Sequence, residues 1–141
     1  MQRNIDVAKQ IYEAFGRGDV PTILEHLAAD VAWESWHNNA AQKAGVSWMQ
    51  ARKGREGVAE FFKAIADLDI RDFNIIALMA NENQVAAEVE HTADVRSSGG
   101  HFREQEIHLW TFNDRGQVTR FRHYIDTAKH IAAAQGRNTE K

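Results

Sequence analysis

The sequence predicts an α+β protein, because patterns typical of helices and of strands occupy separate stretches of the chain. Apolar residues recur at helical spacing through much of residues 4–68. From residue 71 onward they alternate with polar residues, and the short segments between these runs have the composition of hairpin turns. We therefore expect one domain over residues 1–141: a cone-shaped α+β barrel, with a curved mixed or antiparallel sheet wrapped around three helices and a central cavity.

Three helices are expected ahead of the main run of strands. The first ends near Gly18, since glycine readily takes the left-handed conformation that terminates helices. Pro21 suits the first turn of the second helix, where its missing N–H costs nothing. Asp126 is expected to cap a short closing helix. The three predicted helices span residues 4–15, 20–27 and 56–68.

Five strands are expected, one between the second and third helices and four after the third. The first is the short run "VAWESW". The other four form an antiparallel meander, joined by turns at "NEN", "SSGG" and "NDRG". The predicted strands cover residues 31–36, 71–80, 84–96, 102–113 and 117–126.

The composition is that of a soluble globular protein, with 43% hydrophobic and 26% charged residues. The net charge of -3 lacks the basic surplus expected of a nucleic-acid-binding protein. The absence of cysteine excludes disulfides, thiolate catalysis and cysteine-ligated zinc. The N-terminus lacks the apolar core of a signal peptide, and no apolar run approaches the roughly 20 residues of a membrane span. A cytoplasmic protein without nucleic-acid or membrane partners is therefore expected.

Three segments together resemble one known family. They are "IYEAFGRGDVPTILEHLAADVAWE" at Ile11–Glu34, "GREGVAEFFKAI" at Gly54–Ile65 and "HLWTFNDRGQVTRFRHYIDTA" at His108–Ala128. With the strand order, they make the chain similar to the SnoaL-like and ketosteroid-isomerase-like branch of the nuclear transport factor 2-like superfamily. The resemblance implies the cone fold and its cavity. It leaves the activity open, because this fold hosts isomerases, cyclases, dehydratases, epoxide hydrolases and non-catalytic binders.

The residues that would make the chain a ketosteroid isomerase are changed. By the resemblance, the general base falls on Ser35, with Glu34 one residue earlier. The oxyanion-hole tyrosine falls on Ile11, with Tyr12 beside it on a different helix face. The neutral oxyanion-hole aspartate falls on His108. The resemblance therefore implies a cavity in the same place with different chemistry.

Alternation along the strands predicts which side chains line this cavity. With the face of His108 taken as inward, period two brings His91 and His123 to the same side from the flanking strands. An apolar hollow with a few polar groups is typical of a small-ligand pocket. The predicted lining is Trp33, His37, Phe61, Val89, His91, Trp110, Phe112, Phe121 and Ile125.

The imidazoles suggest acid–base chemistry on a small apolar or aromatic carbonyl compound, since histidine titrates near neutral pH. The predicted catalytic residues are His108 and His123 as the acid–base pair, with Glu34 or Ser35 as an outside partner. Alternatively, each histidine is a core residue bonded to a backbone carbonyl, a tyrosine or another histidine. Three histidines with a carboxylate also suit zinc or iron in type. No HxH or HExxH spacing occurs, however, so we expect neither a metal nor a cofactor.

Three functions stay open from the sequence alone. The first is an isomerase, cyclase or dehydratase that abstracts and returns a proton, with an imidazolium or the Trp33 N–H stabilising an enolate oxygen. The second is a binding module that uses the cavity as a receptacle. The third is a dimerisation domain whose cone is filled by its own side chains. A cavity too small for a ligand favours the third function.

The outer sheet face is expected to form a homodimer interface. It mixes acidic residues with arginine and tyrosine, and the resemblance implies that two sheets pack back to back. The expected interface residues are Glu88, Glu90, Arg120, Arg122 and Tyr124.

One long loop, Asn38–Lys53, carries Trp48 and Met49. A loop of this length is usually functional or disordered, and its tryptophan argues against disorder. We expect a lid over the cavity mouth; the alternative is that Trp48 and Met49 cover the open end of the core.

Overall fold

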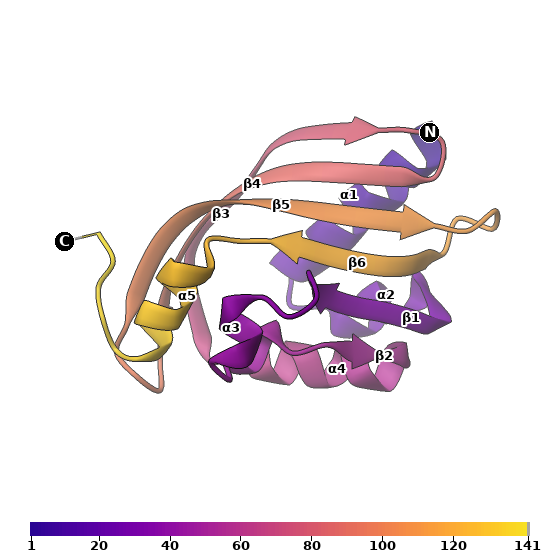
Figure 1. Cartoon of the computed structure of the whole chain (residues 1–141). Coiled ribbons are helices and arrows are strands. Elements are labelled where there is room, and N and C mark those ends of the chain that lie inside the picture. Colours follow the sequence, from indigo (N-terminus) through magenta and orange to yellow (C-terminus); the bar gives the residue numbers. More distant parts are fainter. Residues whose placement is uncertain (141) are drawn as a thin grey trace.

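The computed structural model describes residues 1–140 and confirms the α+β expectation, with helices lying against one curved sheet (Figure 1). The helices are α1 (Gln2–Gly16), α2 (Val20–Glu25), α3 (Ala40–Lys43), α4 (Gly54–Ile65) and α5 (Thr127–Ala134), with a short 3-10 helix, η1 (Ser47–Met49). The strands are β1 (Leu27–Ser35), β2 (Arg52–Lys53), β3 (Leu68–Ala80), β4 (Gln84–Val95), β5 (His101–Phe112) and β6 (Val118–Tyr124). The sheet order is β2-β1-β6-β5-β4-β3, so the sheet is open. β1 runs parallel to β6, and the other neighbouring pairs are antiparallel.

One face of this sheet is buried along β4 and β5. Buried residues alternate with more exposed ones along β4 and β5, which is the period-two pattern of strands with one covered face. α1, α2 and α4 lie on the covered side, and α5 packs against the far end of β5 (Figure 1). The core, and any cavity in it, therefore lies between the sheet and these helices.

The local signals at the helix ends are confirmed. Gly18 has a φ of +69°, in the left-handed region. Asp19 caps α2 by accepting a hydrogen bond from the backbone N–H of Thr22, and Asp126 caps α5 by accepting one from Lys129. Within residues 1–140, no helix combines the length and the apolar character that crossing a membrane requires.

Three stretches differ from the expected elements. Leu68 was expected at the end of the third helix but begins β3. Leu27 was expected at the end of a helix but begins β1, because it pairs with Val118 of β6 and its carbonyl accepts two hydrogen bonds from Arg55. The expected loop Asn38–Lys53 contains α3, η1 and β2. Asn39 explains α3, since its side chain accepts hydrogen bonds from two backbone N–H groups of the first turn.

The outer sheet face carries the residues expected at a dimer interface. All five are half-buried and alternate with inward-facing residues; they are Glu88, Glu90, Arg120, Arg122 and Tyr124. Arg122 forms an ion pair with Glu34 at 2.8 Å across β1 and β6. The homodimer stays a prediction, which sedimentation in solution tests directly: it requires twice the 16.0 kDa of one chain.

Candidate functional site

A chamber of about 70 Å³ lies between the concave face of the sheet and the helices. Its walls are mostly aromatic, with Trp33, Trp110 and Phe121 from the sheet and Phe61 from α4. The polar side chains in the lining are Tyr12, His91, Glu106, His108, His123 and His130. An apolar hollow with converging polar groups is the usual form of a small-ligand site.

A wider vestibule of about 490 Å³ adjoins the chamber. The two hollows share much of their lining, including Phe15, Phe62 and Phe73. Some residues line the vestibule but not the chamber, among them Gly16 and Val20. They lie at the end of α1, the start of α2, the end of α4 and the middle of β3. The chamber therefore opens toward this side of the molecule.

Most of the predicted lining residues do lie on the chamber wall. These are Trp33, Phe61, His91, Trp110 and Phe121, together with His108 and His123. Val89, Phe112 and Ile125 are buried in the core but are not part of the wall. The assignment of His37 is wrong, because β1 ends at Ser35 and the following turn leaves His37 exposed to solvent.

Glu34 and Ser35 do not lie at the chamber. Glu34 points to the outer face, where it pairs with Arg122, because it alternates with the inward-facing Trp33. Ser35 is fully buried, but its hydroxyl bonds to the segment after β1: it accepts hydrogen bonds from Asn39 at 2.5 Å and Gln42 at 3.2 Å. Neither residue can serve as the outside partner of a chamber histidine.

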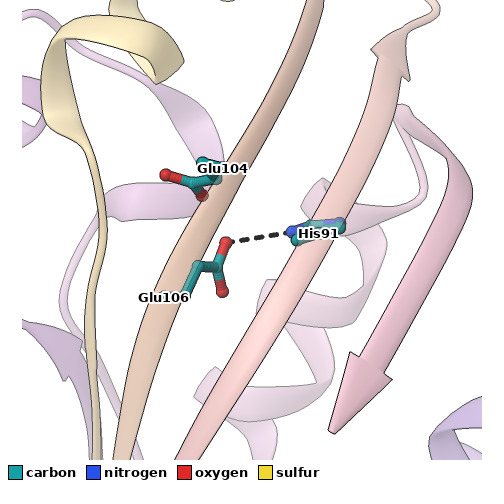
Figure 2. A group of neighbouring side chains, drawn as sticks. All are labelled: His91, Glu104 and Glu106. Atoms are coloured by element: carbon teal, nitrogen blue, oxygen red, sulfur yellow. Dashed lines mark hydrogen bonds and ion pairs between the residues drawn. The ribbon is translucent and has the colours of Figure 1, made fainter. Parts of the chain in front are cut away.

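Glu106 of β5 connects two of the polar side chains that line the chamber, His91 and His108. Its side chain is only 4% exposed. One carboxylate oxygen lies 2.9 Å from Nδ1 of His91 and the other lies 2.7 Å from Nε2 of His108. Figure 2 shows Glu106 projecting from its strand toward His91 on the neighbouring β4. One carboxylate thus orients two imidazoles.

The hydrogen bonds of His108 and His91 determine which nitrogen of each ring carries the proton. The Trp110 N–H donates to the Tyr12 oxygen at 2.9 Å, so the single Tyr12 proton is free to point at Nδ1 of His108, 2.7 Å away. Nδ1 of His108 is then an acceptor, and its Nε2–H donates to Glu106. On the other branch, Nδ1–H of His91 donates to Glu106, which accepts both bonds as a carboxylate.

The expected direct pair of His108 and His123 is not formed. Both nitrogens of His108 are already bonded, to Tyr12 and to Glu106. The ring centres of His108 and His123 lie 6.3 Å apart, and no hydrogen bond joins them. His108 therefore has no free ring nitrogen with which to exchange a proton with a ligand.

A second carboxyl, Glu104, shares a proton with Glu106. Burial, followed by the hydrogen bond and charge of Glu106, raises the pKa of Glu104 to about 11. Burial alone would also raise the pKa of Glu106, but hydrogen bonds from Glu104, His108 and His91 outweigh it and hold that pKa well below its usual range. At neutral pH Glu104 is therefore protonated and Glu106 is ionised.

Two buried nitrogen atoms of the chamber wall have no hydrogen-bond partner among residues 1–140. They are Nε2 of His91 and Nε1 of Trp33. With Nδ1–H used on Glu106, Nε2 of a neutral His91 is a bare acceptor, whereas the Trp33 N–H is a donor. Within the described residues 1–140, His123 likewise has no hydrogen-bond partner. Burial lowers the pKa of His123 to about 4, so this ring is neutral and offers one N–H.

The family follows from the sequence as a whole. Residues 8–121 match the family model described as the SnoaL-like domain. The chain belongs to the SnoaL-like family. No curated protein matches this SnoaL-like protein.

Solved structures confirm the nuclear transport factor 2-like fold of this SnoaL-like protein. An NTF2-like protein of unknown function from Burkholderia pseudomallei aligns with a TM-score of 0.80 at 21% identity, over 94% of this chain and 98% of that one. A candidate polyketide cyclase from Xanthomonas campestris pv. campestris aligns with a TM-score of 0.72 at 25% identity, over 94% and 96%. TerC, crystallised with polyporic acid, aligns with a TM-score of 0.74 at 22% identity, over 89% and 93%.

A cluster in the SnoaL-like protein has the spacing of metal ligands, because candidate ligand atoms of His91, Glu104 and Glu106 lie within 4.8 Å of one another (Figure 2). The neighbouring His130 is the natural fourth ligand, but its Nδ1 accepts a hydrogen bond from the Trp48 N–H at 2.9 Å. Its Nε2 therefore carries the proton and donates to Glu104. A metal-bound histidine instead donates from its second nitrogen. The bonding pattern thus fits shared protons better than a metal ion.

Sequence reasoning missed several polar residues of the site: Tyr12, Glu104, Glu106 and His130. For the two glutamates a signal existed, since the alternation that turns His108 inward also turns Glu104 and Glu106 inward. Tyr12 was expected on a different helix face from Ile11, but both residues line the chamber. Nothing in the sequence marks His130 beyond its place in α5.

The segment 38–53 closes the chamber at the end away from the vestibule. Trp48 lines the chamber and bonds to His130, and Met49 is fully buried. Neither residue lines the vestibule. The expected lid over the mouth is therefore wrong, and the alternative, a cover over the open end of the core, is correct.

Proposed function

We propose that this SnoaL-like protein is an enzyme that moves a proton on an apolar or aromatic carbonyl compound, with His91 as the general base. The observation that carries the proposal is the Nε2 of His91, which has no hydrogen-bond partner among residues 1–140, in a residue that lines an apolar chamber and whose Nδ1 lies 2.9 Å from the buried carboxylate of Glu106. A base oriented by a third group is a recurring catalytic arrangement. Relatives of this fold that are described as candidate polyketide cyclases and isomerases support the reaction class.

The proton step balances within these two residues. Nε2 of His91 takes the proton from the carbon next to the carbonyl, and the electron pair of that C–H bond forms the enolate. The imidazolium that results is stabilised by Glu106, 2.9 Å from its Nδ1. In an isomerisation the imidazolium returns the proton to a different atom of the enolate. In a dehydration the enolate expels a hydroxyl, which takes the proton from the imidazolium and leaves as water. In a cyclisation the enolate attacks a second carbonyl, and the alkoxide formed there takes the proton.

The enolate oxygen needs donors, and β1 and β6 each bring one donor to the chamber wall. These are the N–H of Trp33 and the N–H of neutral His123, and both rings neighbour Phe61, at 5.5 and 6.2 Å between centres. A neutral imidazole suits this role because its N–H donates a hydrogen bond to the enolate oxygen and does not take up the proton that His91 moves. Burial favours this state, since it lowers the pKa of His123 to about 4.

His108 and Tyr12 act as positioning residues in this proposal. His108 donates to the oxygen of Glu106 that His91 does not use, and Tyr12 fixes the tautomer that makes this possible. Burial raises the pKa of Tyr12 far above its usual range, so its hydroxyl stays protonated. The pair thus keeps Glu106 aligned with His91.

Deuterium exchange tests the proposal with 2-tetralone, a ketone whose C–H bonds next to the carbonyl are acidic. The wild-type protein is expected to accelerate exchange in D2O above the buffer rate, measured by NMR. His91→Asn keeps an N–H for Glu106 but deletes Nε2, so the acceleration should fall at least 100-fold, roughly the contribution of one general base.

The matched control is His26→Asn, because His26 lies outside both hollows and should leave the rate unchanged. Wild-type exchange in His91→Asn would rule out His91 as the base. Tight binding of 2-tetralone by the wild type without any exchange would favour the binding module instead.

A further inference from the structure

The sizes of the two hollows limit how a ligand can occupy them. The chamber measures about 70 Å³. An apolar protein cavity of about 150 Å³ holds a single benzene ring. The chamber therefore admits a small head group such as a carbonyl with its neighbouring carbons, and the rest of a larger ligand must lie elsewhere.

The vestibule is the adjoining space, at about 490 Å³, and its chemistry is apolar. Among its described lining residues, only Tyr12 has a polar side-chain atom; the others are aliphatic, phenylalanine or glycine residues. Tyr12 uses its proton on His108. A polar or charged extension of the ligand would find no partner here and would lose its hydration, so an apolar one is favoured.

Three phenylalanines connect the hollows, because they line both. Phe15 of α1 lies 5.1 Å from Phe73 of β3 and 6.2 Å from Phe62 of α4, between ring centres. All three rings are only half-buried. A ligand that reaches from the vestibule to the polar wall passes these rings.

We infer that the substrate is an elongated carbonyl compound, with its carbonyl end in the chamber and an extended apolar body in the vestibule. This inference rests on the proposed function for the chamber, since it takes His91 as the group that meets the carbonyl end. It adds the substrate class: the apolar body is a chain or ring system of several carbons, and most of the binding free energy comes from the vestibule.

Unbranched methyl ketones from 2-butanone to 2-octanone test the inference, because they keep the head constant and lengthen the body by one methylene at a time. Kd is measured from the NMR shifts of the indole N–H signals. Each methylene buried in the vestibule is expected to lower Kd about fourfold. An unchanged Kd along the series overturns the inference.

Two neighbouring positions on β3 provide a matched pair of variants. Ile75 lines the vestibule, whereas Ile76 is 50% exposed and lines neither hollow. Ile75→Asp should raise the Kd of 2-octanone at least tenfold and leave that of 2-butanone unchanged, while Ile76→Asp should change neither. If Ile75→Asp does not fold, Ala66→Trp fills the vestibule from the exposed end of α4 and should give the same selective loss.

The outcomes separate this inference from the proposed function. Equal effects of Ile75→Asp and Ile76→Asp on 2-octanone overturn the elongated substrate, whatever 2-tetralone exchange shows. A chain-length gain without any catalysed exchange supports the vestibule as the apolar subsite of a binding protein and overturns the enzyme.

Discussion

Replacing Glu106 with glutamine is expected to lower the rate of catalysed 2-tetralone exchange by about 10⁴-fold, comparable to changing the buried carboxylate of a catalytic triad to an amide. Glu106 accepts N–H bonds on both oxygens, from His91 and from His108. An amide accepts on one side only and presents an N–H on the other. One of the two rings must then switch tautomer, and for His91 the switch puts the proton on Nε2, where the base is needed.

Glu104→Gln is the matched control, two residues away on the same strand. Glu104 is already protonated at neutral pH and hydrogen-bonded to Glu106, and a glutamine N–H can replace that donor. The variant leaves one N–H of Asp126 or His130 unpaired, so it should lose about 1–3 kcal/mol of stability. Its exchange rate should stay near that of the wild type. Equal losses of rate in both variants would show that the cluster acts through stability alone.

The second large effect expected is a maximum in stability near pH 6.5. Burial lowers the pKa of His123 to about 4 and that of His130 to about 3, whereas an unfolded histidine titrates near 6.5. Below pH 6.5 these two histidines are therefore protonated in the unfolded chain but stay neutral in the folded chain. Lowering the pH consequently favours unfolding. The pKa of Glu104 works in the opposite direction, because it is raised to about 11 by burial and by Glu106. Above pH 4.5, the pKa of Glu104 in the unfolded chain, Glu104 stays protonated in the folded chain but loses its proton in the unfolded chain.

Between pH 4.5 and 6.5, the two histidines add two protons to the unfolded state and Glu104 adds one to the folded state. The unfolded state therefore binds one proton more than the folded state in this range. The free energy of unfolding consequently rises with pH by about 1.4 kcal/mol per unit. Above pH 6.5 only Glu104 of these three groups acts, and stability falls by about the same amount per unit.

Urea unfolding of the wild type and Glu104→Gln between pH 5 and 9 measures these contributions. The difference between the two curves isolates Glu104, because glutamine does not titrate. The disadvantage of the variant should shrink by about 1.4 kcal/mol per pH unit across this whole range, because Glu104 acts at every pH above its unfolded value. Parallel curves would mean that Glu104 is ionised in the folded protein, contrary to the shared proton.

Alternation along the strands explains why much of the wall could be predicted from the sequence. His91, His108 and His123 all face the chamber, and Trp33 and Trp110 accompany them, because period two is fixed by strand geometry. The same rule does not apply beyond the end of a strand. Because β1 ends at Ser35, alternation along β1 could not predict the direction of His37.

The partners of the histidines could not be predicted, since they depend on the register between strands. In β4 and β5, His91 stands directly opposite Glu104, yet its hydrogen bond goes diagonally to Glu106. The rotation of α1 decides that Tyr12 rather than Ile11 reaches His108. The position of the mouth depends on how segment 38–53 docks, which no local pattern encodes.

The protonation of His91 is the most direct test of the account. Two-bond 1H–15N correlation spectra of the histidine rings distinguish a protonated from a bare nitrogen. The account predicts opposite tautomers at neutral pH: a proton on Nδ1 and a bare Nε2 in His91, but a proton on Nε2 and a bare Nδ1 in His108 and His130. A proton on Nε2 of a neutral His91 would leave no base on the chamber wall and would contradict the mechanism.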